Sequence, residues 1–221
     1  QRLEEYYNLG ARFAKWRAVI KIGSGIPSNA CIQTNAHALA RYAALCQEAS
    51  IVPIVEPEVL MDGDHTIETC HDVSEKSFRS VFEELAIQDI YLEGMVLKPN
   101  MVVSGIDCID QAGVEEVADR TVECLKATVP DDVPGCAFLS GGQSSEDATA
   151  HLSKMNEQYG DSLPWNLTFS YGRALQNLAL QTWGGEDQNI GPAQEDFYQR
   201  AKYNSLATWG KYSHKMEEIS A

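Results

Sequence analysis

Lys98 is the residue whose surroundings most clearly suggest chemistry. It lies in a mostly apolar run, from Tyr91 to Met101, that has no ordinary use for an ammonium group. Pro99 restricts the residue before it to extended geometry, so we expect Lys98 at the end of a strand. Desolvation favours the free amine, which can attack a carbonyl carbon. The segment alone leaves two interpretations open: a Schiff-base lysine, or a strand-end lysine whose ammonium group reaches solvent.

Two pairs of charged residues could accompany such a lysine. Lys15 and Arg17 are two apart and would share one face of a strand, as would Glu56 and Glu58. The two cations suit an anionic group, although surface charges at a strand end give the same pattern. A carboxylate that ends a buried strand is costly unless it is paired. We therefore expect Glu56 to pair with Lys15 or Lys98, as a general acid/base or in a structural salt bridge.

Two short turns contain the residue types that bind phosphate. Ser140-Gly-Gly and Ser170-Tyr-Gly-Arg173 each follow an apolar run. Their small residues would let phosphate oxygens approach backbone N–H groups. Either sequence is common enough to be accidental, so their position directly after a strand is what makes them candidates. A third turn, Asp62-Gly-Asp-His65, is interpreted as a loop rather than as a metal site.

Five short apolar runs are interpreted as buried strands, and segments with helical spacing lie between them. The strands are expected at 16–22, 51–56, 90–98, 136–139 and 165–171, and the helices at 29–49, 72–88, 113–128, 144–157, 172–183 and 192–210. Strand and helix alternate, which predicts βαβ units and a mainly parallel sheet. Ser28, and Ser144 with Asp147 three residues later, are typical helix start signals.

The candidate residues cluster at the strand ends, where ligands bind in α/β barrels and in open doubly wound sheets. Only the barrel predicts a phosphate site after the last two strands, and both candidate turns lie there. Five strands cannot close an eight-stranded barrel, and a barrel cut there carries two unpaired edges. We therefore predict an α/β fold with one domain over residues 1–221: a partial TIM (β/α)8 barrel with about the last five βα units and without the N-terminal strands.

Composition excludes several classes of function. The formal net charge of -15 opposes binding to nucleic acid or to an anionic membrane surface. The longest apolar stretches are strand-sized, far short of the roughly 20 residues of a membrane helix. The six cysteines include no CxxC pair and no His/Cys cluster at metal-ligand spacing. We expect buried thiols in a reducing compartment, and neither zinc nor an iron–sulfur cluster.

Five motifs at the expected strand ends occur in a definite order. They are Phe13-Ala-Lys-Trp-Arg, Ile54-Val-Glu-Pro-Glu, Leu97-Lys-Pro-Asn-Met, Phe138-Leu-Ser-Gly-Gly-Gln-Ser and Phe169-Ser-Tyr-Gly-Arg-Ala-Leu-Gln. In this order they resemble the strand motifs of class I fructose-bisphosphate aldolase. The likeness runs from about Gly10 to Lys211. Five linked motifs make chance an implausible explanation.

The resemblance implies a Schiff-base mechanism in which Lys98 attacks the ketone carbon of fructose 1,6-bisphosphate. Glu56 would then be the acid/base, and Lys15 would stabilise the charged intermediates. Glu58 would hold the lysines in place. The iminium acts as the electron sink, so neither a metal nor a cofactor is implied. The phosphate-binding positions of the family match Ser140, Gly141, Ser170, Gly172 and Arg173 near the Schiff base, and Arg17 for the far phosphate.

The resemblance also implies partners and a location. The expected ligands are small-molecule sugar phosphates, and the expected partners are cytoskeletal proteins such as actin. The expected assembly is a homotetramer. The expected location is the cytoplasm, with the plastid stroma as the alternative. The family's first three strands and its C-terminal tail have no counterpart in these 221 residues. Two other functions stay open: a non-catalytic phosphosugar-binding or scaffolding protein, and a transaldolase-like Schiff-base enzyme. The separated arginines, Arg17 and Arg173, favour a bisphosphate substrate.

Overall fold

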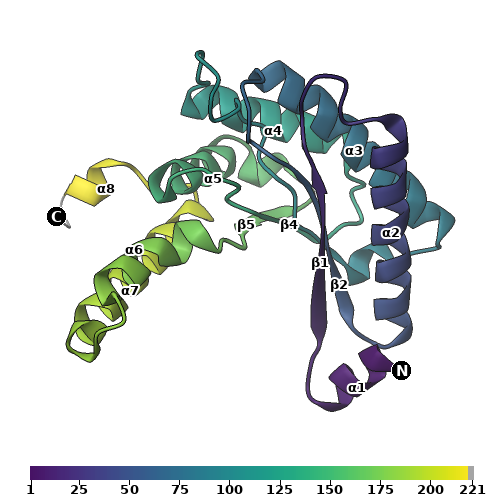
Figure 1. Cartoon of the computed structure of the whole chain (residues 1–221), viewed down its shortest axis with the longest axis horizontal. Coiled ribbons are helices and arrows are strands. Elements are labelled where there is room, and N and C mark those ends of the chain that lie inside the picture. The colour runs from purple at the N-terminus through teal and green to yellow at the C-terminus, as the bar shows by residue number, and fades with distance from the viewer. Residues whose placement is uncertain (219–221) are drawn as a thin grey trace.

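The structure, a computed structural model, describes residues 1–218 and centres on one sheet of five parallel strands in the spatial order β1-β2-β3-β4-β5 (Figure 1). The strands are β1 (Phe13–Ile20), β2 (Val52–Val59), β3 (Val96–Leu97), β4 (Gly135–Phe138) and β5 (Asn166–Phe169). The helices are α1 (Arg2–Asn8), α2 (Asn29–Glu48), α3 (Ile67–Ile87), α4 (Val114–Thr128), α5 (Ser145–Tyr159), α6 (Arg173–Trp183), α7 (Ile190–Ala207) and α8 (Lys215–Glu218). The predicted alternation of strand and helix and the parallel sheet are confirmed.

The two faces of the sheet differ, as β1 makes clear. Ala18 is buried, and the ring of Trp16 lies 6.0 Å from that of Tyr42 in α2. The even-numbered side chains of this strand therefore face the helix layer. Because side chains alternate along a strand, Lys15 and Arg17 lie on the opposite face. Figure 1 shows α2 and α3 on one side of β1 and β2.

The predicted start signals of α2 and α5 are confirmed. The Ser28 hydroxyl accepts a hydrogen bond of 3.1 Å from the Cys31 N–H. At the start of α5, the Ser144 hydroxyl accepts from the Asp147 N–H at 2.9 Å and donates to the Asp147 carboxylate at 2.8 Å. Such caps satisfy N–H groups of the first turn and contribute about 1 kcal/mol each. They fix the point at which α5 leaves the Ser140 turn.

Helix α3 begins at Ile67, earlier than the predicted start at 72. The Thr66 hydroxyl accepts from the Thr69 N–H at 3.4 Å and caps the helix at this point. Ile67 and Cys70 are both buried, so the apolar face of the helix extends back to the cap. The predicted boundary was wrong because the cap and the first buried residues were left in the preceding loop.

The third strand is much shorter than the predicted 90–98. Only Val96–Leu97 is a strand, and Leu92–Gly94 forms a 3-10 turn. The side chain of Gln47 in α2 explains the difference, because it donates to the Tyr91 carbonyl at 2.8 Å and accepts from the Tyr91 N–H at 3.1 Å. Both backbone polar groups of Tyr91 are thereby satisfied outside the sheet.

The loops that follow β2 and β3 are joined by three backbone hydrogen bonds. The N–H groups of one loop donate to carbonyls of the other, in the pairs Gly105–His65 (2.8 Å), Ile106–Met61 (2.7 Å) and Asp107–Gly63 (2.9 Å). The loops approach so closely that a Cβ on Gly105 would lie 2.3 Å from the Gly63 carbonyl oxygen. The loop predicted for Asp62-Gly-Asp-His65 is confirmed.

Four of the six cysteines are buried, as their apolar surroundings predicted: Cys46, Cys70, Cys124 and Cys136. Burial raises the pKa of the Cys136 thiol to about 12. Within residues 1–218, no helix is both long and apolar enough to cross a membrane. Nor does this described part of the chain gather three or more His, Cys, Asp or Glu side chains that could hold a metal ion.

Helix α8 is fastened to the rest of the structure by Arg200 of α7. The guanidinium donates to both carboxylate oxygens of Glu217, at 2.8 and 3.0 Å, and to Glu146 of α5 at 3.1 Å. The Tyr212 hydroxyl donates to the same Glu217 carboxylate at 2.7 Å. A two-pronged contact of this kind is among the stronger hydrogen-bonded ion pairs. We call Arg200, Glu146, Glu217 and Tyr212 the Arg200 clasp.

Candidate active site

The register of the first three strands brings three predicted site residues together. The Lys98 N–H donates to the Val55 carbonyl at 2.8 Å, so Lys98 continues β3 beside Glu56. Lys98 Nζ lies 3.2 Å from Glu56 Oε1, and Lys15 Nζ lies 3.0 Å from Glu56 Oε2. We call Lys15, Glu56 and Lys98 the lysine–glutamate cluster. Its members come from three neighbouring strands and meet on the face opposite the helix layer.

Burial differs sharply within the lysine–glutamate cluster. The Glu56 side chain is 4% exposed, that of Lys98 12% and that of Lys15 44%. A carboxylate at this depth is costly unless it is paired, and each of its oxygens faces a different ammonium group. The expected pairing of Glu56 with Lys15 or Lys98 is confirmed with both. Lys98 does not extend into solvent, so the alternative of a solvent-reaching lysine does not hold.

This geometry is suited to proton transfer at a reacting amine. A proton leaving the Lys98 nitrogen has a carboxylate oxygen at 3.2 Å, within reach of a general base. Lys15 places a second ammonium group on the other carboxylate oxygen, where it can stabilise negative charge that develops nearby. The geometry of the cluster would suit a nucleophile, an acid/base and an electrostatic stabiliser.

Glu58 makes its ion pair with Arg17, at 2.9 Å, rather than with a lysine. The register explains this arrangement, because both cations of β1 pair diagonally. Lys15 lies opposite Ile54 and pairs with Glu56, and Arg17 lies opposite Glu56 and pairs with Glu58. The Glu58 side chain is 5% exposed and that of Arg17 51% exposed. The structure thus differs from the expectation that Glu58 holds the lysines, and gives it Arg17 to orient.

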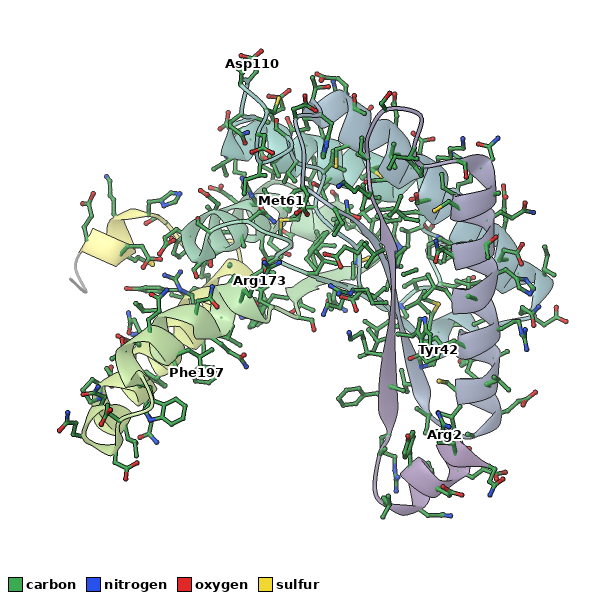
Figure 2. The ribbon with its side chains drawn as sticks, in the orientation of Figure 1. Arg2, Tyr42, Met61, Asp110, Arg173 and Phe197 are labelled. Atoms are coloured by element: carbon green, nitrogen blue, oxygen red, sulfur yellow. The ribbon has the colours of Figure 1, made fainter. Side chains whose placement is uncertain are left out.

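The five residues expected to bind the nearer phosphate come together after β4 and β5. Gly141 has a φ of +65°. The guanidinium of Arg173, a residue labelled in Figure 2, donates to the Gly141 carbonyl, so the two turns touch. The Ser170 N–H donates to the last carbonyl of β4 at 2.8 Å. Gly172 is the N-cap residue of α6, and Ser140 is buried directly after β4. Small residues and backbone N–H groups therefore gather where the barrel architecture predicts a phosphate site.

Asn100 supports the site, although the sequence analysis assigned it no role. Its side-chain oxygen accepts from the Val59 N–H at 2.9 Å, and its amide donates to the Ser74 hydroxyl at 3.0 Å. These bonds tie the segment after Lys98 to the end of β2, which carries Glu56. A signal was available, because a buried amide within an apolar run requires hydrogen-bond partners.

Fold and site together fit one class of protein: α/β barrels in which a lysine at the carboxyl end of a strand can do covalent chemistry and the turns after later strands can bind phosphate. Comparison with known families is more specific. The family model described as fructose-bisphosphate aldolase class-I, of the glycolytic type, matches residues 1–221. The chain belongs to the class I fructose-bisphosphate aldolase family, which sets aside the transaldolase-like alternative.

Individual relatives agree with this assignment. The chain is 61% identical over 212 residues to a probable fructose-bisphosphate aldolase class 1 of Xanthomonas campestris, with 96% of this chain and 63% of that relative covered. It is 52% identical to the cytosolic fructose-bisphosphate aldolase 4 of Arabidopsis thaliana, with 96% and 53% covered.

A solved structure confirms the fold. The fructose-bisphosphate aldolase of Plasmodium falciparum, solved in complex with TRAP and a small-molecule inhibitor, matches with a TM-score of 0.93 at 49% identity. The match covers 96% of this chain and 61% of that chain. The five strands therefore correspond to part of an aldolase barrel, as predicted. The chain spans between 53% and 63% of the length of these relatives.

Proposed function

We propose that the protein, at its native length, catalyses the reversible cleavage of fructose 1,6-bisphosphate to dihydroxyacetone phosphate and glyceraldehyde 3-phosphate. The observation that carries the proposal is the Lys98 side chain, only 12% exposed, with its amine 3.2 Å from the Glu56 carboxylate. The names of the relatives support the same reaction. It would serve glycolysis and gluconeogenesis, or the Calvin cycle in a photosynthetic organism.

In the proposed reaction the Lys98 nitrogen adds to the ketone carbon of the substrate. The carbinolamine then loses water as Glu56 protonates the departing hydroxyl, which leaves an iminium. The iminium takes up the electron pair of the breaking carbon–carbon bond, while the Glu56 carboxylate removes the hydroxyl proton of the carbon that leaves as the aldehyde. Protonation of the enamine and addition of water release dihydroxyacetone phosphate and restore the amine.

The phosphate groups of the substrate are proposed to occupy two separate places. Ser140, Gly141, Ser170, Gly172 and Arg173 would hold the phosphate nearer the Schiff base. Arg17, oriented by Glu58 at 2.9 Å, would meet the far phosphate. A substrate with a phosphate at each end suits this arrangement better than a monophosphate does.

Borohydride trapping tests the covalent step directly. The protein at its native length is incubated with dihydroxyacetone phosphate, reduced with borohydride, digested and mapped by mass spectrometry. We expect a stable adduct on Lys98, because reduction converts the iminium to a secondary amine. An adduct on another lysine, or none on an active protein, would refute the assignment of Lys98.

The matched variant is Lys98→Arg, which keeps a positive charge but removes a usable nucleophile. We expect both the adduct and the cleavage activity to be lost. Cleavage retained by a folded Lys98→Arg protein would contradict a Schiff-base mechanism at this residue.

A second candidate function is a non-catalytic phosphosugar-binding or scaffolding role. It would use the turns at Ser140 and Ser170 without covalent chemistry at Lys98. Intact mass separates the two candidates. A native product near 24.4 kDa that binds sugar phosphates without forming an adduct would support the scaffolding role. A heavier product that forms the Lys98 adduct would support the enzyme.

Assembly and location are proposed from family membership. We expect one domain in which residues 1–221 form part of the barrel, and we expect the protein to assemble as a homotetramer. Its partners would include cytoskeletal proteins such as actin. Its location would be the cytoplasm, with the plastid stroma as the alternative. Relatives described as cytosolic support the cytoplasm. Native mass spectrometry tests the tetramer, and cell fractionation tests the location.

A further inference from the structure

Gln143 ends the candidate phosphate turn that begins at Ser140, and the proposed reaction gives it no task. Its backbone N–H and its side-chain amide both donate to the Ser140 carbonyl, each at 3.1 Å. A carbonyl oxygen has two lone pairs, so this single residue saturates the Ser140 oxygen. The first peptide of the turn is therefore held in one orientation.

Fixing this carbonyl also fixes the Gly141 N–H. The two groups belong to one planar trans peptide and point in opposite directions, so the Gly141 N–H points away from Gln143. The next peptide has its own contacts: Arg173 donates to the Gly141 carbonyl, and the Gly142 N–H donates to Met61 Sδ at 3.0 Å. Arg173 and Met61 are both labelled in Figure 2. Since phosphate binding at such a turn depends on where the N–H groups point, these contacts set its geometry.

His151 of α5 determines which way the Gln143 amide faces. His151 Nδ1 lies 2.6 Å from Gln143 Oε1. With the amide turned over, its oxygen would face the Ser140 carbonyl oxygen, and two acceptors would repel. The observed orientation requires the proton on Nδ1. The imidazole is 7% exposed, and burial lowers the pKa of His151 to about 4, so the neutral ring with this proton is the working form.

The same amide reaches the segment that follows the candidate nucleophile. Gln143 Nε2 lies 3.7 Å from Met101 Sδ, and Met101 is 1% exposed. Met101 follows Lys98 by three residues in the loop after β3. Gln143 therefore contacts both the phosphate turn and the loop that carries Lys98.

We infer that Gln143, oriented by His151, is a positioning residue that aims the Gly141 N–H and sets the phosphate turn relative to Lys98. Neither side chain need touch the substrate. The inference rests on the proposed function, because it assigns the turn to the phosphate nearer the Schiff base.

The test is Gln143→Met in the protein at its native length, which keeps the side-chain length and removes the amide. We expect KM for fructose 1,6-bisphosphate to rise about tenfold while kcat stays within about threefold, because the lost bonds position the bound phosphate. The Kd of inorganic phosphate, measured by calorimetry in an Arg17→Ala background, should rise by a similar factor.

Two variants of His151 test the orienting contact. His151→Leu removes the donor and should reproduce the rise in KM and in the phosphate Kd. His151→Asn keeps an N–H donor close to the Nδ1 position and should bring both values back to within about threefold of wild type. Failure of His151→Leu to change either value, in a folded protein, would overturn the role of His151.

Gln47→Met is the matched control. Gln47 makes the same kind of bond, from its amide to the Tyr91 carbonyl at 2.8 Å, before β3 rather than after a strand. It should lower the free energy of unfolding much as Gln143→Met does, without changing KM. A Gln143→Met protein that loses stability but keeps wild-type KM and phosphate Kd would show a purely structural bond and overturn the inference.

The two proposals fail in different ways. A wild-type protein that binds phosphate but does not cleave fructose 1,6-bisphosphate would overturn the proposed function, and the phosphate Kd would still test Gln143. An active enzyme in which Gln143→Met changes kcat alone would leave the proposed function intact and overturn the positioning role.

Discussion

The lysine–glutamate cluster and the Arg200 clasp have the same charge pattern with opposite sign. In the first, the Glu56 carboxylate, 4% exposed, lies between two ammonium groups. In the second, the Arg200 guanidinium, 6% exposed, lies between the carboxylates of Glu146 and Glu217. Both place one deeply buried charge between two counter-charges that are less buried.

Hydrogen bonding distinguishes the two clusters. Arg200 has four donor contacts to three side chains, and two of them form a fork on Glu217. Glu56 lies within ion-pair distance of both lysines, yet its Oε2 accepts no hydrogen bond of good geometry within the described residues. A charge with several hydrogen bonds suits fastening two segments, whereas a paired but incompletely bonded one can exchange protons with a ligand.

The largest effect is expected for Glu56→Gln, which removes the charge of the side chain and keeps its shape. We expect the initial rate of fructose 1,6-bisphosphate cleavage to fall about 10²-fold to 10⁴-fold, the usual contribution of a general acid/base. The matched variant is Glu217→Gln in the clasp, which should leave kcat within about threefold. Equal losses in both variants would mean that the two clusters do not differ in function.

The free energy of unfolding should depend more on the Arg200 clasp than on the lysine–glutamate cluster. Arg200→Met leaves two carboxylates facing an apolar side chain, so we expect the free energy of unfolding in urea to fall by about 3 kcal/mol. Lys15→Met removes a half-exposed partner and should cost less than about 1 kcal/mol. A larger loss for Lys15→Met than for Arg200→Met would contradict the assignment of the clasp as the fastening site.

His151 sharpens the comparison because it is buried against a neutral amide instead of an ion. Burial lowers its folded-state pKa from 6.5 to about 4, the nearby Asp147 raises it, and His214 lowers it slightly. Between these pH values the unfolded chain binds more protons, so stability falls as the pH drops from about 6.5 towards 4. In the wild type, this effect should lower the free energy of unfolding by about 2 kcal/mol between pH 7 and pH 4.5. The His151→Asn protein should lack this loss. Urea titrations of both proteins at pH 7 and pH 4.5 measure the difference, and parallel losses would contradict it.

The smallest effect is expected for Glu146→Gln. The Glu146 side chain is 46% exposed, and it makes one of the Arg200 contacts, at 3.1 Å. Solvent screening limits such a contact, so the melting temperature should change by an amount equivalent to less than about 1 kcal/mol. A loss as large as that of Arg200→Met would mean that Glu146, rather than the fork on Glu217, carries the clasp.

The sequence predicted the site better than it predicted the elements around it. Glu56 and Lys98 could be placed together because each ends an apolar run, and the carboxyl ends of parallel strands meet at one edge. Lys15 lies near the start of its strand, and the sequence offered it only as one of two possible partners of Glu56. The length of β3 could not be predicted, since Gln47 ends the extended stretch through hydrogen bonds from a helix 44 residues away in the chain. The partner of Glu58 was missed because register, rather than spacing, decides which side chains meet.

The Arg200 clasp had no local signal at all. Arg200 lies among polar residues of α7, and its partners Glu146 and Glu217 lie 54 and 17 residues away. Gln143 was part of a quoted motif, but its partner His151 is contributed by the next helix. Contacts between side chains on separate elements depend on packing, which a single sequence does not encode in its periodicity.

Because side chains alternate along β2, the face on which each carboxylate lies depends on whether the number of residues before it in the strand is even or odd. Glu56 and Glu58 face the ligand side only because they are an even number of residues from the start of the strand at Val52. Loss of a single codon between Val52 and Glu56, with the start of the strand held in place, would turn both carboxylates toward the helix layer. Loss of two would restore the facing and shorten the strand. Within this strand, a deletion of an even number of residues therefore keeps the two carboxylates on their face, and a deletion of an odd number does not.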